Sequence, residues 1–299
     1  MVTNHMRKHI PGVTATSTTD LAVLKPFAPV GAAYDEMFLV RWMASVPPQA
    51  IVLMLLIWPM ASYAQSGGYG MGDAFAALWR WIPFLTFQGF LFNVLISIFA
   101  MAIGTLAGAA LGLGQISQNT WLRRIAWGIT QLFRNAPWLV ILFIVLLAFP
   151  FEIEIFGLII PIPAWMKAVI GLSLPIMANI SEIVRGAVQS VPSAQWEAAE
   201  SLSFSQTQTL WQIILPQCFK RMIPPWMNWY AILTMATPLC SLLGVGEIIT
   251  FSRQAMEAEN NRPELLVPFF GYAMVLFFAY CYPIARFTIA LEKRFAVKL

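Results

Sequence analysis

The sequence predicts an all-α membrane protein that crosses the bilayer about six times. Of its 299 residues, 59% are hydrophobic and only 11% are charged, whereas a soluble domain carries about 25% charged residues. The apolar residues also come in runs of roughly 20, the length that an α-helix needs to span the hydrocarbon core. Because so few polar residues remain to cover a water-facing surface, a bilayer explains this composition better than a soluble core.

Six apolar runs define the predicted spans. Their approximate bounds are 43–64, 88–113, 136–158, 165–187, 224–246 and 267–289. Residues 1–40 lack the apolar core and cleavage site of a signal peptide, and we expect them to form a cytoplasmic tail. Residues 41–87 would hold the first span and an external loop, in which glycines predict flexibility and Trp79 and Trp81 predict an interfacial helix. The main transmembrane domain would cover residues 88–296.

The basic residues predict how the chain is oriented. With a cytoplasmic N-terminus and six spans, fourteen of the 18 Lys and Arg residues fall on the cytoplasmic side, and four fall outside. Those four are Arg80, Lys167, Arg253 and Arg262. Cytoplasmic loops of membrane proteins carry such an excess, so we expect both termini to be cytoplasmic. No Lys/Arg-rich run typical of nucleic-acid binding is present in the sequence.

The second predicted span carries a stripe of small residues. Gly104, Gly108 and Gly112 follow one another at the GxxxG spacing, which lets two helix backbones approach closely in lipid. The stripe therefore predicts a close helix neighbour. Packing within this chain is the favoured interpretation, and packing against another subunit is the alternative.

The longest predicted cytoplasmic loop, residues 188–221, has the composition of two short helices. Ser193 is the expected N-cap of the first helix, which would run over about 193–203. Ser205 and Gln208 have the spacing of a capping box for a second helix over about 205–215, with Pro216 near its end. Such helices either lie on the membrane surface or dock a cytoplasmic partner.

Several stretches in and around this loop resemble the permease subunits of ABC importers. Glu197, Ala198 and Ala199, followed by Ile214 and Pro216, resemble the EAA motif of that family. Further stretches resemble its polar amino-acid uptake branch, namely 132–140, 179–186, 189–192, 195–199, 241–245 and 291–295. They occur in the family's order, and the resemblance covers about residues 88–296.

The resemblance implies a type I ABC importer permease fold and a coupling helix that docks onto a separate ATPase subunit. The implied coupling residues are Gln195, Glu197, Ala198, Ala199, Ser203, Ile214 and Pro216. The other implied partners are a second permease, of the same or a related chain, and an extracytoplasmic substrate-binding protein. The location would be the bacterial inner membrane, and the substrate a polar amino acid or a related small polar solute.

Two positions depart from the family pattern. Ser203 stands where the family usually has glycine, at the break between the two coupling helices, and serine resists a positive φ more than glycine does. Met235 and Ala236 stand where many members carry Lys-Asp. The second departure removes a charged pair from the fifth span and leaves polar contacts with a substrate to other residues or to a partner permease.

Polar residues inside the predicted spans are the candidates for a pathway or a gate, because polar groups are expensive in lipid. They are Asn179, Glu182, Arg185 and Thr237. Glu182 and Arg185, at i and i+3, could equally form a plain helix ion pair.

The sequence shows no residue set for chemistry. Cys218, Cys240 and Cys281 fit no metal or redox spacing, and no GxxxxGK[ST] phosphate loop is present. We therefore expect a non-catalytic chain with no cofactor or metal, whose partner subunit hydrolyses ATP. The alternative function is a secondary transporter or channel driven by an ion gradient. That alternative usually needs deep charges or broken helices, and few deep charges are present.

Overall fold

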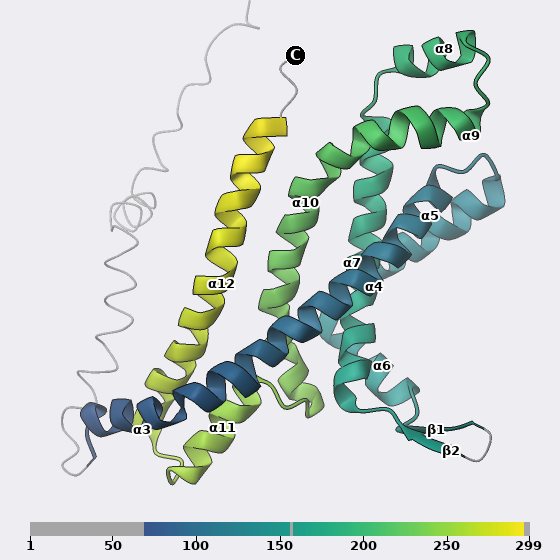
Figure 1. The fold of residues 1–299 in the computed structure, drawn as a ribbon. Coiled ribbons are helices and arrows are strands. Elements are labelled where there is room, and N and C mark those ends of the chain that lie inside the picture. Colours follow the sequence, from purple (N-terminus) through teal and green to yellow (C-terminus); the bar gives the residue numbers. More distant parts are fainter. Residues whose placement is uncertain (1–68, 156–157, 296–299) are drawn as a thin grey trace, which may run out of the picture. The chain divides into compact units, whose positions relative to one another are not determined.

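The computed structural model describes residues 69–155 and 158–295. These residues form helices and one small hairpin (Figure 1), and they belong to a single unit of the chain. The predicted N-terminal tail and the first predicted span, 43–64, lie outside the described residues. Within the described part, the all-α prediction is confirmed, with the hairpin as the exception.

The first described helix is longer than the sequence predicts. The α-helix α3 (Met71–Phe84), the π-helical turn η2 (Leu85–Phe90) and α4 (Leu91–Gln115) run on as one helix of 45 residues. The predicted boundary between 87 and 88 therefore falls inside a helix, and Gly72 is helical instead of part of a flexible loop. Trp79 and Trp81 do lie on a helix, as expected.

The small-residue stripe of α4 packs against α7 (Ala164–Gln189) of the same chain. A Cβ added at Gly104 would lie 2.6 Å from a side-chain carbon of Ile176, and one added at Gly108 would lie 2.7 Å from Cβ of Ile180. Real Cβ atoms do not approach so closely, so only glycine allows this contact. The favoured interpretation of the GxxxG spacing, packing within the chain, is confirmed.

The predicted span 136–158 is wrong. After α5 (Thr120–Asn135), helix α6 (Trp138–Ala148) ends and the chain forms an antiparallel hairpin of β1 (Glu152–Ile155) and β2 (Leu158–Pro161). Pro150 disfavours helix at the residue before it. Alternating Glu and Ile in β1 also suit a strand, whereas two carboxylates in a span would be costly. The pair α5 and α6 is bent by 107°.

Lys167 of α7 holds the root of this hairpin. Its Nζ atom donates hydrogen bonds to the backbone oxygens of Phe149, at 2.9 Å, and Leu146, at 3.4 Å. It also lies 3.5 Å from the ring centroid of Phe151. The lysine is 1% exposed, so it satisfies carbonyls at the end of α6 that no helical N–H can reach.

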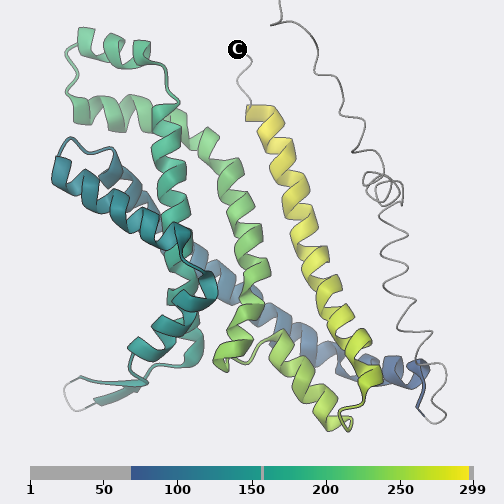
Figure 2. The ribbon, with the colours of Figure 1, turned by 180° about the vertical axis from the view of Figure 1, so that it is seen from behind.

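The C-terminal half contains two long helices that lie side by side in both views (Figures 1 and 2). They are α10 (Leu215–Ala236), which continues into the 3-10 turn η4 (Thr237–Leu243), and α12 (Leu266–Phe295). In the chain, α11 (Ile248–Ala258) and the short 3-10 turn η5 (Pro263–Leu265) connect η4 to α12. The hydroxyls of Tyr230 and Tyr280 meet at 2.7 Å across this helix pair.

Three helical segments of the described chain are long and apolar enough to cross a membrane, namely Met71–Gln115, Ala164–Gln189 and Pro263–Phe295. The number rises to five if each of two bent pairs counts as one span. The second of these pairs, Gln206–Leu243 with Ile248–Ala258, is bent by 51°. Since the first predicted span lies outside the described residues, the total of six stays a prediction.

Candidate functional site

Helix α8 (Ser193–Ser201) stands apart from the long helices, beyond the end of α7 (Figure 1). Its N-cap is Pro192, and the predicted cap, Ser193, is instead the first helical residue. The correction has a simple reason: proline fixes φ near −65° and has no N–H to leave unpaired. Pro192 therefore starts the helix without a side-chain cap.

A left-handed residue ends α8. Ser203 has φ +61°, and its N–H donates to the Glu200 oxygen at 2.8 Å, while the N–H of Phe204 donates to the Ala199 oxygen at 3.1 Å. These two bonds form the Schellman motif, in which the left-handed position is usually glycine. Ser203 therefore adopts the backbone that the family's glycine favours and carries the strain of a side chain there.

The second short helix begins as predicted and does not end as predicted. Ser205 and Gln208 form the expected capping box at the start of α9 (Gln206–Gln208). The helix then continues through the π-turn η3 (Thr209–Ile214) into α10, without a stop at Pro216. Because proline has no N–H, it breaks an α-helical bond, and the adjoining π-turn absorbs that change of register.

The seven predicted coupling residues divide into two sets. Ala199 and Ile214 are 2% and 0% exposed and pack inside the chain, with Ile214 in a small core that Trp196 adjoins. The others are exposed: Gln195, Glu197, Ala198, Ser203 and Pro216. Ala199 therefore cannot touch a partner, and Ala198 and Glu197 carry the outward surface. Leu202, which we did not predict, is 72% exposed beside them.

Two contacts fasten this region to the end of α7. The Cys218 thiol lies 3.3 Å from the Ala187 oxygen. Nη1 of Arg221 donates to the backbone oxygen of Ser190 at 2.9 Å and to its hydroxyl at 2.8 Å. Both residues belong to α10, so these contacts join the start of α10 to the end of α7. Helix α8 itself follows α7 directly in the chain and packs against η3, which continues into α10.

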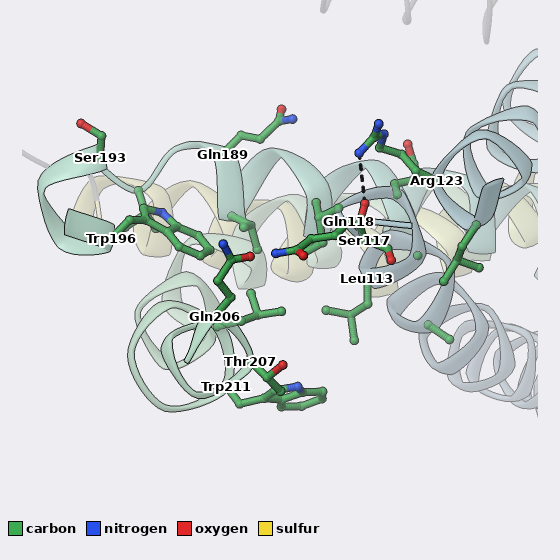
Figure 3. A pocket seen from close by; sticks show the side chains of 18 residues that line it. Leu113, Ser117, Gln118, Arg123, Gln189, Ser193, Trp196, Gln206, Thr207 and Trp211 are labelled. Carbon is green, nitrogen blue, oxygen red and sulfur yellow. Dashed lines mark hydrogen bonds between the residues drawn. The ribbon is translucent and has the colours of Figure 1, made fainter. Parts of the chain in front are cut away.

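A cleft of about 1140 Å³ opens beside residues 188–221, which we call the coupling region after the role that the sequence predicts for it. One wall comes from the end of α4 and the start of α5, and the other from the end of α7, α8 and α9. Figure 3 shows Gln118 and Gln206 pointing toward one another across it, with Trp196 alongside. Sequence patterns did not indicate this cleft, because its walls are far apart in the chain.

Glu182 and Arg185 do form an ion pair, and they are not alone. Arg185 Nη2 lies 2.6 Å from a Glu182 carboxylate oxygen, and Nη1 of Arg134 lies 3.4 Å from the same oxygen. Arg185 also donates to Gln189 at 2.8 Å. This network joins α5 to the last turns of α7, just before the coupling region begins.

The other two candidates for a pathway lie elsewhere. The Asn179 side chain donates to the Pro175 oxygen of its own helix at 2.8 Å. Thr237 lies in a separate buried cluster, where its hydroxyl accepts from Asn93 at 2.9 Å. Asn93 also donates to Glu247, and both are 0% exposed. Sequence reasoning missed this cluster, although Glu247 inside an apolar stretch was a usable signal.

The described residues contain no group of three or more His, Cys, Asp or Glu side chains that could hold a metal ion. The arrangement is therefore a mechanical one: an exposed helix, fixed at its base to two long helices. What it can do is transmit a displacement, and the residues around it offer surfaces for a partner.

Comparison with known proteins identifies relatives over most of the described chain. Residues 100–291 match the family model described as "Binding-protein-dependent transport system inner membrane component". The probable amino-acid ABC transporter permease protein YckA of Bacillus subtilis (strain 168) is 34% identical over 209 residues, which cover 70% of this chain and 88% of that protein. The probable amino-acid ABC transporter permease protein y4tF of Sinorhizobium fredii is 31% identical, over 61% of this chain and 78% of that one.

The fold is also known from a solved structure. A crystal structure of an amino acid ABC transporter with histidines aligns with a TM-score of 0.62. The sequences are 21% identical, and the alignment covers 74% of this chain and 98% of the other. This likeness supports the helical architecture described above.

Proposed function

Because the chain belongs to the family of binding-protein-dependent transport system inner membrane components, we propose that it forms the translocation path for a polar amino acid or a related small polar solute. The family supplies the membrane subunit of an ATP-driven importer, and its members work with a separate ATPase subunit. The choice of substrate class follows the relatives, which are probable amino-acid permeases.

The observation that carries the coupling proposal is the position of α8. Its outward side presents Glu197, Ala198 and Leu202, with Leu202 72% exposed. An exposed apolar side chain beside a small one and a carboxylate suits a groove in a protein partner. We assign this surface to docking of the ATPase. A secondary transporter driven by an ion gradient would need no such docking helix, so α8 favours the ATP-driven importer.

The proposed mechanism follows from how α8 is fastened. When ATP binding moves the ATPase subunits, α8 moves with them and displaces η3, against which it packs and which continues into α10. Cys218 and Arg221 pass this movement from α10 to the end of α7. Packed helices move as rigid elements, so a small shift at one end tilts the whole span. Glu182 would then act as a gate residue, because its links to Arg134 and Arg185 join α5 to α7.

The remaining parts of the importer are proposed on the same basis. A second permease, of the same or a related chain, would complete the path, and an extracytoplasmic binding protein would deliver the substrate. The chain is a multi-pass inner-membrane protein, and we place both termini in the cytoplasm. It would bind no cofactor itself, would perform no catalysis, and would leave ATP to the partner ATPase. Asn179 and Thr237 stay candidates for the path.

The direct test is Ala198→Trp, with Ala258→Trp as the matched control. Both alanines are exposed, but Ala258 ends α11 instead of lying on the coupling helix. The importer is assembled in proteoliposomes with its ATPase and binding protein. We expect Ala198→Trp to lose ATPase co-purification and ATP-driven uptake, and Ala258→Trp to keep both. Uptake at the wild-type level by Ala198→Trp would overturn the docking assignment. Ala199→Trp is a poor test because Ala199 packs inside the chain.

A second experiment examines the gate. Glu182→Gln keeps the shape of the side chain and removes the charge that the two arginines share. We expect the variant to hydrolyse ATP faster without substrate and to gain less from substrate, while Glu257→Gln at an exposed position of α11 leaves both rates near wild type. Equal stimulation by substrate in Glu182→Gln and wild type would leave Glu182 with a structural role only.

The substrate class needs its own measurement. Uptake of labelled amino acids into the same proteoliposomes, with the cognate binding protein, gives it directly. Saturable ATP-dependent uptake of a polar amino acid supports the proposal. Uptake restricted to a solute of another class would refute the substrate assignment and leave the coupling assignment intact.

A further inference from the structure

The charge that lines the cleft beside the coupling region is positive. Eighteen residues line it, all within the described chain, and Arg123 is the only one of them that carries a charge. Its guanidinium is exposed and donates to the Ser117 backbone oxygen at 3.2 Å, which holds it at the rim (Figure 3). Because none of these described lining residues is a carboxylate that could neutralise Arg123, the cleft favours an anionic ligand.

Part of the cleft lining is apolar, and we call this part the floor. It consists of the aliphatic side chains of Leu113, Ile116, Leu122, Val188, Val191 and Leu210. The indole rings of Trp196 and Trp211 lie at its edges. A ligand that fills this volume therefore needs an apolar part of substantial length together with its negative charge, which describes an amphipathic anion better than a free amino acid or a nucleotide.

The position of the cleft along the long helices also favours a lipid ligand. Its lining includes the last turn of α4, which ends at Gln115, and the last turn of α7, which ends at Gln189. Both helices belong to segments that are long and apolar enough to span a membrane, so the cleft lies at one end of two candidate spans. Tryptophan rings and an arginine at that level are typical of contacts with lipid headgroups.

We propose that this cleft is a binding site for an anionic phospholipid of the cytoplasmic leaflet, with its phosphate at Arg123 and an acyl chain along the apolar floor. The choice of leaflet rests on the proposed function, because that function places the coupling helix on the cytoplasmic side. The lipid would lie between the α4–α5 turn and the coupling helices, so its presence would affect how freely α8 moves.

The test compares Arg123→Gln with Arg124→Gln. The two arginines are adjacent and exposed, and only Arg123 lines the cleft. The full chain is purified in mild detergent from membranes rich in phosphatidylglycerol, and bound lipid is counted by native mass spectrometry. We expect wild type and Arg124→Gln to retain one phosphatidylglycerol molecule, and Arg123→Gln to retain it about fivefold less. Equal retention by the two variants would overturn the site.

A second pair of variants tests the apolar floor without touching charge. Ala110→Trp places a large ring in the cleft, whereas Ala102→Trp places it on an exposed part of the same helix outside the cleft. We expect only Ala110→Trp to displace the lipid. Displacement of phosphatidylglycerol by millimolar glycerol 3-phosphate would refute the lipid and favour a soluble phosphate ligand. Lipid retention is measured without ATPase, so a failed docking experiment would leave this result unaffected.

Discussion

The side-chain amide of Asn93 on α4 donates a hydrogen bond of 3.0 Å to the carboxylate of Glu247, and both residues are fully buried. The Asn93 oxygen also accepts from the backbone N–H of Ile248 at 3.1 Å. Glu247 in turn caps α11 by accepting from the N–H of Thr250 at 2.9 Å. Asn93 therefore fixes the position of the chain between η4 and α11. The buried Glu247 carboxylate is stabilised by the N–H groups that donate to it and by the positive N-terminal end of α11.

Removal of this carboxylate should destabilise the protein. Glu247→Ala leaves one of the two Asn93 amide N–H groups and the Thr250 N–H without an acceptor, at a cost of about 2–3 kcal/mol. We expect a lower midpoint of thermal unfolding for the purified chain in detergent, with Glu247→Gln much closer to wild type because it keeps an acceptor oxygen. Glu257→Ala, on the exposed side of the same helix, should leave the midpoint unchanged. A Glu247→Ala midpoint equal to that of the control would contradict the role given to this cluster.

The glycine stripe gives a steric prediction. A Cβ at Gly108 would lie 2.7 Å from both Cβ of Ile180 and the backbone oxygen of Met177, and overpacking of this kind costs about 1–3 kcal/mol. Gly108→Ala should therefore lower the yield of folded protein and the unfolding midpoint. Gly186→Ala is the matched control, because Gly186 is also helical and has nothing within 4 Å of its added Cβ. Equal midpoints for the two variants would show that α4 and α7 pack less closely than described.

At Ser203 we predict a substitution that stabilises the local structure. Its φ of +61° strains any residue with a Cβ, by about 1 kcal/mol relative to glycine. Ser203→Gly should therefore slow hydrogen exchange at the Phe204 amide, whose bond to Ala199 closes the turn, by about fivefold. Ala198→Gly, inside α8, should speed exchange in that helix because glycine weakens a helix interior. Faster exchange in Ser203→Gly would argue against the left-handed turn.

Lys167 gives a local prediction. Lys167→Met removes the donor to the Phe149 and Leu146 oxygens at the root of the hairpin. We expect backbone exchange in residues 149–163 to become about fivefold faster, as loss of a net hydrogen bond of roughly 1 kcal/mol implies. Lys220→Met, at an exposed position, should change nothing there. If the hairpin exchanged at the wild-type rate in Lys167→Met, another contact would have to hold it.

Local sequence patterns predicted much of the coupling region. The capping box at Ser205 and Gln208 depends on residues three apart, and it was found as predicted. The α8 helix and the break after it followed from residues close together in the chain. Local patterns gave a wrong helix end at Pro216. The adjoining π-turn lets the helix continue through this proline into α10.

The fold class, the glycine stripe and the loop of two short helices were therefore determined by the sequence itself, because hydropathy, small-residue spacing and capping act over a few residues. Tertiary structure decided which groups meet across long separations. It buried Ala199 and left Ala198 outside, paired Asn93 with Glu247, and set the α4–α5 turn opposite α8 to make the cleft. The physical reason is that burial and pairing depend on which surfaces the packed helices bring together, and spacing along one helix does not specify its neighbours.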